Sequence, residues 1–300
     1  MPLYYAALLG LSTTTRLLLD AGAEVNAQGG FFGNALQAAS QEGHEQIVKT
    51  LLNAGAEVNA QGGHYGNALQ AASQEGHEQI VKTLLDAGAD VNAEGGYFGN
   101  ALQAASLRGR EQVVKTLLDA GADINAQGGE YGNALQAASW GGHKQIVKML
   151  LNAGANVNAE GGYFGNALQA ASYGGREQVV KTLLDAGAEV NAQGGKYGNA
   201  LQAASQEGHE QIVKTLLDAG AEVNAQGGKY GNALQAASWG GHEQIVKMLL
   251  NAGAEVNAQG GHYGNALQAA SVRGHKQVVK TLLDASAHQH LEDDLALGAE

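Results

Sequence analysis

One 33-residue segment recurs along this chain without insertion or deletion. The copy from residue 33 reads GNALQAASQEGHEQIVKTLLNAGAEVNAQGGHY, and further copies begin at Gly66, Gly99, Gly132, Gly165, Gly198, Gly231 and Gly264. A fixed period of roughly 20–50 residues is typical of a repeat array, in which each unit buries its apolar face against its neighbours. The 300 residues therefore predict one stack of repeated units rather than two separate domains.

Each copy carries the signals of two short helices. Asn34 is an N-cap residue with Gln37 three positions later, which predicts a capping box. Gly43 is expected to end this first helix in the left-handed conformation. A second helix is predicted from about His44 to Ala54, because its apolar residues fall on one face at helical spacing.

A glycine-rich segment joins each second helix to the next copy. Gly55 is expected to stop the helix, and the extended stretch that follows contains the pair Gly62-Gly63, which predicts a tight turn. Each unit is therefore expected to consist of helix, turn, helix and a projecting hairpin-like finger. Position 65 and its equivalents are always aromatic, which predicts packing between neighbouring fingers.

These features resemble the ankyrin repeat family over residues 1–287. The stretch GHEQIVKTLLNAGAEVNA is similar to the family pattern GHxxIVxxLLxxGADVNA, and NALQ stands where the family has TPLH. Gly62 replaces the family's turn Asp, and Tyr65 followed by Gly66 replaces its turn Gly. The resemblance implies an all-α solenoid of about nine helix-turn-helix units with projecting hairpin fingers. The variant GGxYGNALQAAS further resembles the C-terminal ankyrin arrays of fungal NOD-like receptor proteins.

The repeat boundaries divide the chain into three segments. Residues 1–32 are expected to form a divergent N-terminal repeat, since Pro2-Leu3 falls where Ala35-Leu36 falls one period later. Residues 33–286 hold eight near-identical copies, and the last helix is expected to end near Ser286, where the recurring glycine is lost. Residues 287–300 are expected to be a floppy acidic tail. The start in the middle of a unit indicates a fragment of a longer protein or a trimmed gene.

Composition limits the partners and the location. The chain has no cysteine and a formal net charge of −12, from 29 acidic and 17 basic residues. An acidic chain is a poor candidate for binding nucleic acid or an anionic membrane. The apolar run YYAALLGL is too short to span a bilayer and has no basic residue before it. We therefore expect a cytoplasmic monomer that binds neither nucleic acid nor membrane.

The residues predict no catalytic or metal site and no cofactor. The recurring GGxYG lacks the βαβ context of a phosphate loop, and no nucleophile or zinc-protease motif occurs. Histidines occupy one repeat position at residues 44, 77, 143, 209, 242 and 275, with arginine at 110 and 176, which favours a structural hydrogen bond. The cluster His288-Gln289-His290 with three following acids is an open but weak metal candidate.

The copies differ at a few positions, and these are the candidate binding residues. One variable set is the pair before the inter-helix glycine, and the other is the residue at the tip of each finger. In ankyrin arrays the fingers and first helices line a concave groove, so the resemblance implies that both sets face a protein or peptide ligand there. Trp, Tyr and Arg at such positions are typical of binding hot spots. The candidates are Leu107, Arg108, Trp140, Tyr173, Trp239 and Arg273 before the glycine, and Tyr97, Glu130, Tyr163, Lys196 and Lys229 at the tips.

Three functions remain open at this point. The leading one is a non-enzymatic protein-protein interaction module, the ligand-recognition part of a larger receptor-like protein with a role in innate recognition. A passive structural scaffold or spacer of stacked repeats is the main alternative, and neutral drift would then explain the variable positions. An enzyme with a site in the groove or tail is the third. The identity of the ligand does not follow from the sequence.

Overall fold

The computed structural model describes residues 1–297, with side chains described as far as Ala287. These residues form helices in two compact units, one ending at Asn156 and the other beginning at Val157. The helices of the first unit are α1 (Pro2–Leu8), α2 (Ser12–Asp20), α3 (Ala35–Glu42), α4 (Glu45–Asn53), α5 (Ala68–Glu75), α6 (Glu78–Asp86), α7 (Ala101–Leu107), α8 (Glu111–Asp119), α9 (Ala134–Gly141) and α10 (Lys144–Asn152). Those of the second unit are α11 (Ala167–Tyr173), α12 (Glu177–Asp185), α13 (Ala200–Glu207), α14 (Glu210–Asp218), α15 (Ala233–Gly240), α16 (Glu243–Asn251), α17 (Ala266–Arg273) and α18 (Lys276–Leu297).

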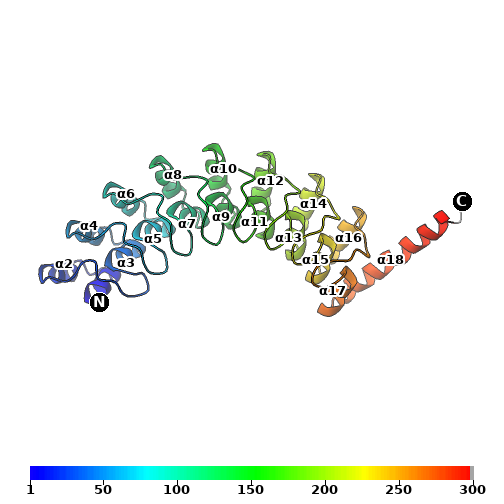
Figure 1. Cartoon of the computed structure of the whole chain (residues 1–300), viewed down its shortest axis with the longest axis horizontal. Helices are drawn as coiled ribbons and strands as arrows, with labels where there is room; N and C mark the ends of the chain where they lie inside the picture. Colours follow the sequence, from blue (N-terminus) through cyan, green and yellow to red (C-terminus); the bar gives the residue numbers. More distant parts are fainter. Residues whose placement is uncertain (298–300) are drawn as a thin grey trace. The chain divides into compact units, whose positions relative to one another are not determined.

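Within each unit the first helices of successive repeats pack side by side, and so do the second helices (Figure 1). The first helices come close together because their packed positions carry small side chains, such as the fully buried Ala38 and Ala39. The second helices contribute Ile47, Val48 and Leu51 to the same core, all nearly inaccessible to solvent. This arrangement confirms the expected all-α solenoid of about nine helix pairs.

The expected helix caps are present. The Asn34 side chain accepts a hydrogen bond of 2.9 Å from the backbone N–H of Gln37, and the reciprocal bond that completes a capping box forms in α5, α7, α9, α13 and α15. Gly43 ends α3 at a φ of 80°, in the left-handed region. Helices α7 and α11 end one residue earlier, before Arg108 and Gly174, with the left-handed glycine following.

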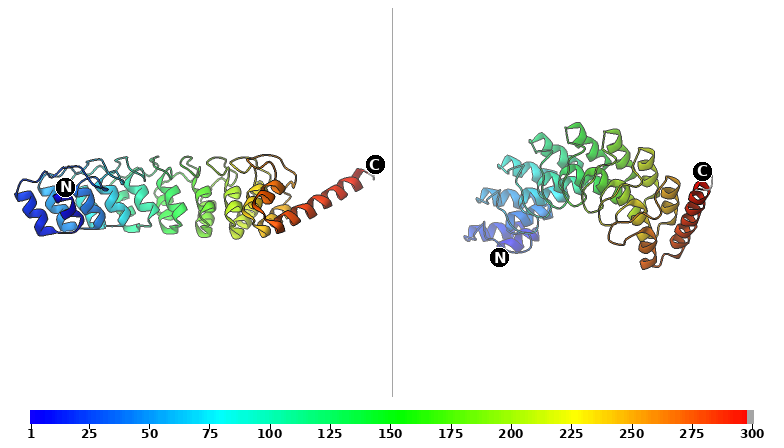
Figure 2. Two further views of the ribbon diagram at one scale, coloured as in Figure 1. Left: turned by 90° about the horizontal axis from the view of Figure 1, so that it is seen from below. Right: turned by 45° about the vertical axis from the view of Figure 1, so that its right-hand side comes forward.

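The fingers are narrow hairpins that lie along one edge of the helices of each unit (Figure 2). In one of these turns the backbone N–H of Gly62 donates to the carbonyl of Gly66 at 2.8 Å, and the equivalent bridge recurs in later copies. The Gln37 side chain donates to the carbonyls of Ala60, Gly62 and Gly66, so the first helix of one repeat holds the finger at the start of the next. The predicted Gly-Gly turn is confirmed.

The last helix differs from the expectation. We expected it to end near Ser286, but α18 continues to Leu297. In the other copies a glycine with positive φ, such as Gly253, follows the second helix and stops it. Serine stands at this position in the last copy and permits the helical conformation, so the helix enters the segment that we expected to be a floppy tail. The candidate metal cluster at residues 288–294 lies outside the described side chains.

Candidate functional site

The finger tips of each unit form a row joined by backbone hydrogen bonds. In the first unit His64 N–H donates to the Phe31 carbonyl at 3.1 Å, and Tyr97 N–H to the His64 carbonyl at 3.4 Å. In the second unit Lys196, Lys229 and His262 donate in the same way to the tips before them, at 3.2, 3.2 and 3.0 Å. These bonds hold the tips of neighbouring fingers side by side along the row. We call each row, together with the variable ends of the first helices, the fingertip face of its unit.

The always-aromatic residue after the tip packs against its equivalent in the next finger. The ring centroids of Phe32 and Tyr65 are 5.8 Å apart, and those of Tyr65 and Phe98 are 6.1 Å apart, in stacked geometry. Stacked pairs at 6.4 and 6.2 Å recur in the second unit between residues 164 and 197 and between residues 230 and 263. Finger-to-finger packing is therefore confirmed as the structural role of this position.

The fingertip face of the first unit contains a depression of about 290 Å³. Its lining residues are His64, Tyr65, Tyr97, Phe98, Leu107, Arg108, Tyr131 and Trp140. The Trp140 indole lies 5.5 Å from the Tyr131 ring, and the Arg108 guanidinium lies 5.9 Å from the Phe98 ring centroid. Tyr97 at the rim keeps 43% of its surface exposed. An aromatic floor with a cation at its edge suits a large apolar side chain of a partner.

Two carboxylates add negative charge near this depression. Burial, followed by the charge of Glu130, raises the pKa of the Tyr131 phenol. Burial also acts to raise the pKa of Glu75, but hydrogen bonds from the side chains of residues 74 and 41, with the positive charges of Arg110 and Arg108, outweigh it and hold that pKa below its ordinary value. Glu75 therefore stays ionised at neutral pH.

In the second unit Tyr173 and Lys196 belong to an aromatic cluster. Tyr173 stacks on Tyr197 with centroids 4.5 Å apart and lies 5.4 Å from Phe164. The Lys196 ammonium donates a hydrogen bond to the Tyr163 hydroxyl and lies 4.8 Å from the centroid of that ring. Burial, followed by hydrogen bonds with Tyr163 and Tyr173, raises the pKa of Tyr197, which stays neutral. Cation–π contacts therefore hold the lysine over a rigid aromatic base.

A second cluster in the same unit is built around Trp239. Its indole contacts Tyr230 at 5.2 Å and Tyr263 at 6.3 Å between centroids. The Arg273 guanidinium lies 4.5 Å from the Trp239 ring, and the Lys229 ammonium lies 5.4 Å from the Tyr230 ring. Burial, reinforced by negative charge at neighbouring groups, raises the pKa of Tyr230 to about 12. Two cations therefore border one aromatic surface.

The predicted binding residues fall into three groups by accessibility. Side chains are exposed at Tyr97, Arg108, Glu130, Tyr163, Lys196, Lys229 and Arg273. They are half-buried at Trp140, Tyr173 and Trp239, because each of these also packs against finger aromatics. Leu107 is only 8% exposed and belongs to the apolar cluster beneath the depression, so it supports the surface rather than presenting itself to a ligand.

Sequence reasoning missed the surface role of two finger aromatics. Tyr65 and Tyr131 line the depression of the first unit and remain partly accessible. We assigned their position mainly to packing between fingers, since an aromatic residue occurs there in every copy. No signal in the sequence set these two apart, because Tyr197 and Tyr230 carry the same hydroxyl at this position and are only 4% exposed.

The recurring histidine holds successive repeats together. In the first unit a ring nitrogen of His77 donates to the carbonyl of Gln41 at 3.0 Å, and His143 does so to Leu107 at 2.9 Å. Arg110 uses its Nε to make the equivalent bond with the carbonyl of Gln74 at 2.9 Å. This confirms the predicted structural role. Among the residues with described side chains, no three His, Asp or Glu residues lie close enough to hold a metal ion.

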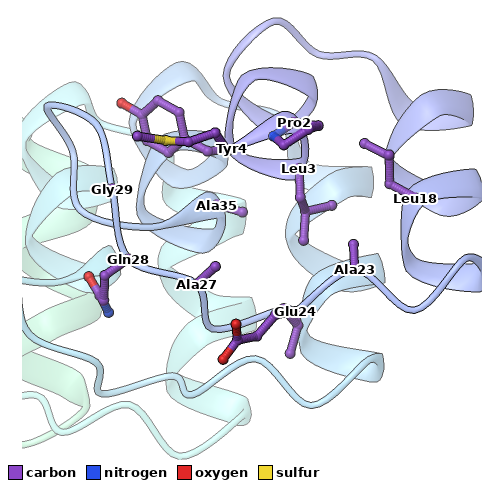
Figure 3. A pocket seen from close by; sticks show the side chains of 12 residues that line it. Pro2, Leu3, Tyr4, Leu18, Ala23, Glu24, Ala27, Gln28, Gly29 and Ala35 are labelled. Carbon is purple, nitrogen blue, oxygen red and sulfur yellow. The ribbon is translucent and has the colours of Figure 1, made fainter.

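A further hollow of about 260 Å³ lies at the N-terminal end of the first unit (Figure 3). It is lined by α1, by Leu18 of α2, by the segment after α2 and by Ala35, and its polar side chains include those of Gln28 and Glu24. None of the predicted binding residues lies there. Within residues 1–297, no helix combines the length and the apolar character needed to cross a membrane.

Comparisons with known proteins agree with this geometry. The family description "Ankyrin repeats (3 copies)" matches in overlapping windows that run from residue 3 to residue 293. The crystal structure of the human ASB11 ankyrin repeat domain superposes with a TM-score of 0.65 at 27% identity, covering 74% of this chain and 99% of that one.

A shorter match links the chain to a curated fungal protein. Over 55 residues it is 54% identical to the azaphilone pigments biosynthesis cluster protein L of Monascus ruber, and the match covers 16% of this chain and 12% of that protein. Ankyrin repeats are protein-interaction modules that generally act without catalysis. Since the family description covers nearly the whole chain and the helix pairs and fingers agree with it, the chain belongs to the ankyrin repeat family.

Proposed function

We propose that this chain is a non-enzymatic protein-binding module that holds a protein or peptide partner on its fingertip faces. The observation that carries the proposal is the convergence of the variable positions. Residues from different repeats that vary among the copies, such as Arg108 and Trp140, lie together around one depression in the first unit. By contrast, positions that stack the repeats, such as Asn34 and Gln37, recur in every full copy.

The constant residues on the exposed second helices also favour a binding function over neutral drift. Gln46 and Lys49 have identical equivalents in every full copy, although both are exposed. Other solvent-accessible positions also vary, such as that of Glu45, which is Lys144 in another copy, but they take two or three residue types. The finger tip takes five types, namely Phe, His, Tyr, Glu and Lys, so variation is concentrated on the fingertip faces, whereas neutral drift acts on all exposed positions alike. A passive spacer remains the alternative function, because near-identical stacked units would also serve that role.

The wider context is part of the proposal. We take the array to be the ligand-recognition part of a larger receptor-like protein with a role in innate recognition, acting as a cytoplasmic monomer. The resemblance of GGxYGNALQAAS to the arrays of fungal NOD-like receptor proteins supports the receptor context. The match to a Monascus ruber protein covers only 12% of that protein, which supports no more than the occurrence of such repeats within a longer protein. Sequencing of the full transcript, cell fractionation and sedimentation equilibrium test these three points.

The test of the binding function compares three arrays as bait in affinity capture. One has the native sequence. In the uniform array every full copy carries Gln, Glu and His at the three variable positions, as in Gln41, Glu42 and His64, a combination that the fold already accommodates. The control array carries as many substitutions at the positions of Gln46 and Lys49, which are exposed on the second helices.

We expect the native and control arrays to capture a partner that the uniform array loses, with all three melting cooperatively. The captured partner, once purified, should bind the native array directly in solution. Equal capture by the native and uniform arrays would contradict the proposal and favour the spacer.

A further inference from the structure

The fingertip face of the second unit carries positive charge on an acidic protein. Eight of its variable positions, at the ends of the first helices and at the finger tips, hold a charged or aromatic residue. They include the cations Lys196, Lys229 and Arg273 and the carboxylate Glu207. The whole chain has a formal net charge of −12. This face therefore has more cations than carboxylates, although the whole chain is acidic. A charged ligand responds mainly to the charges within about 10 Å, so it meets a positive surface here.

These three cations are held by aromatic rings rather than by carboxylates. Lys196 contacts Tyr163, and Arg273 contacts Trp239 at 4.5 Å. Among the described side chains, the ion pairs that form involve other cations, such as Lys247 with Glu243 at 2.7 Å on α16. The cations on the face are exposed and keep their capacity to bind a carboxylate from another molecule.

The same face offers a place for an apolar side chain. Trp239 is half-buried between Tyr230 and Tyr263, with Lys229 and Arg273 on its borders. An aromatic surface bordered by two cations suits a peptide that has a large apolar residue flanked by acids.

From this geometry we infer that the fingertip face of the second unit binds an acidic peptide segment with a large apolar anchor residue, a conclusion that rests on the proposed function. The Lys229 N–H lies 3.2 Å from the Lys196 carbonyl oxygen, and a backbone hydrogen bond of this kind keeps the Cα atoms of the two tips about 5–6 Å apart. An extended peptide advances about 6–7 Å in two residues, and its alternate side chains point the same way. Acidic residues at every second position therefore match the spacing of the two lysines.

The first unit offers an internal contrast. Its fingertip face has the same construction, but Glu42, Glu75 and Glu130 stand there with the single variable-position cation Arg108. The acidic peptide should therefore prefer the second unit.

The experiment measures the binding of three synthetic fluorescent peptides to the full chain by anisotropy. All three share one central Trp, and every second residue is Asp in the first, Lys in the second and Ser in the third. A face variant carries Lys196→Glu, Lys229→Glu and Arg273→Glu. The matched control carries Lys181→Glu, Lys214→Glu and Lys247→Glu, which change the net charge equally but lie exposed on the second helices of the same unit.

We expect the Asp peptide to bind the native chain about tenfold more tightly than the Ser peptide, given several exposed charge pairs, and binding should weaken as salt rises. The control variant should keep this preference and the face variant should lose it. Equal binding of the Asp and Ser peptides, equal loss in both variants, or no binding of any peptide would overturn the inference. Partner capture by the native array but not by the uniform array would still support the proposed function in each of these cases.

Discussion

Replacing Gly96 by alanine tests how the fingers are stacked. Gly96 has a φ of 61°, and a Cβ added there would overlap the backbone carbonyl of Tyr65 in the preceding finger and lie 2.7 Å from the amide nitrogen of Gly66. Backbone atoms in a hydrogen-bonded turn have no other rotamer to adopt. The substitution should therefore push the two fingers apart and disturb the depression that they line.

Gly88 in the same unit provides the matched control. It also has a positive φ, 88°, but a Cβ added there meets no atom within 4 Å. Both substitutions place an L-residue in the left-handed region, which costs about 1–2 kcal/mol. Overpacking adds roughly 1–3 kcal/mol at Gly96 alone. The free energy of unfolding should therefore fall by about 1–2 kcal/mol for Gly88→Ala and by about 2–5 kcal/mol for Gly96→Ala.

Residue-resolved hydrogen exchange is the suitable assay, supported by urea titration, because repeat arrays can lose cooperativity and unfold in parts. The amide of Tyr97, which donates to the His64 carbonyl at 3.4 Å, should lose protection in Gly96→Ala and keep it in Gly88→Ala. Equal destabilisation by the two substitutions, with equal protection at Tyr97, would refute the argument that backbone contact between fingers requires this glycine.

Substitutions at Trp140, His77 and Tyr230 each remove one of the side-chain groups described above. Trp140→Gln should weaken partner binding at least about tenfold, as measured by titration calorimetry. It should lower the free energy of unfolding by only about 1 kcal/mol in urea denaturation, because glutamine occupies this position in other copies and the loss is limited to the packing of the indole on Tyr131. His77→Ala should cost about 1 kcal/mol of stability, whereas His77→Arg should be close to neutral, because Arg110 makes the equivalent bond in the next copy. Titration of Tyr230 should lower the free energy of unfolding between about pH 10 and pH 12. The pKa of this phenol rises from 10.0 to about 12 on folding, so the neutral phenol contributes about 3 kcal/mol to the free energy of unfolding. This contribution is fully present below about pH 10 and is lost as the pH passes about 12. Alkaline unfolding of Tyr230→Phe should lack this component when followed by circular dichroism.

Each of these has a result that would count against it. Unchanged binding by Trp140→Gln would remove Trp140 from the interface. Equal stability of the alanine and arginine variants at position 77 would show that the bond between repeats contributes nothing. A native chain and a Tyr230→Phe chain with the same stability profile above pH 10 would mean that the phenol titrates at its ordinary pKa in the folded state.

The sequence by itself determined the repeat fold. The 33-residue period, the Asn and Gln of the capping box and the apolar face of each second helix are local signals, and eight copies of them agree with one another. Each repeat packs only on its neighbours, so the fold follows once one unit and its stacking positions are known. The loss of glycine at Ser286 was also visible, but its consequence, the continuation of α18 to Leu297, was not anticipated.

Only the tertiary structure decided which of the variable residues present a surface. Leu107 and Arg108 are neighbours in sequence, yet Leu107 is 8% exposed and Arg108 lies open over Phe98. Adjacent residues near a helix end point about 100° apart, so one faces the core and the other faces solvent. The need for glycine at position 96 comes likewise from Tyr65, 31 residues earlier in the chain. These contacts join different repeats, and the distances across them depend on how closely two folded repeats approach.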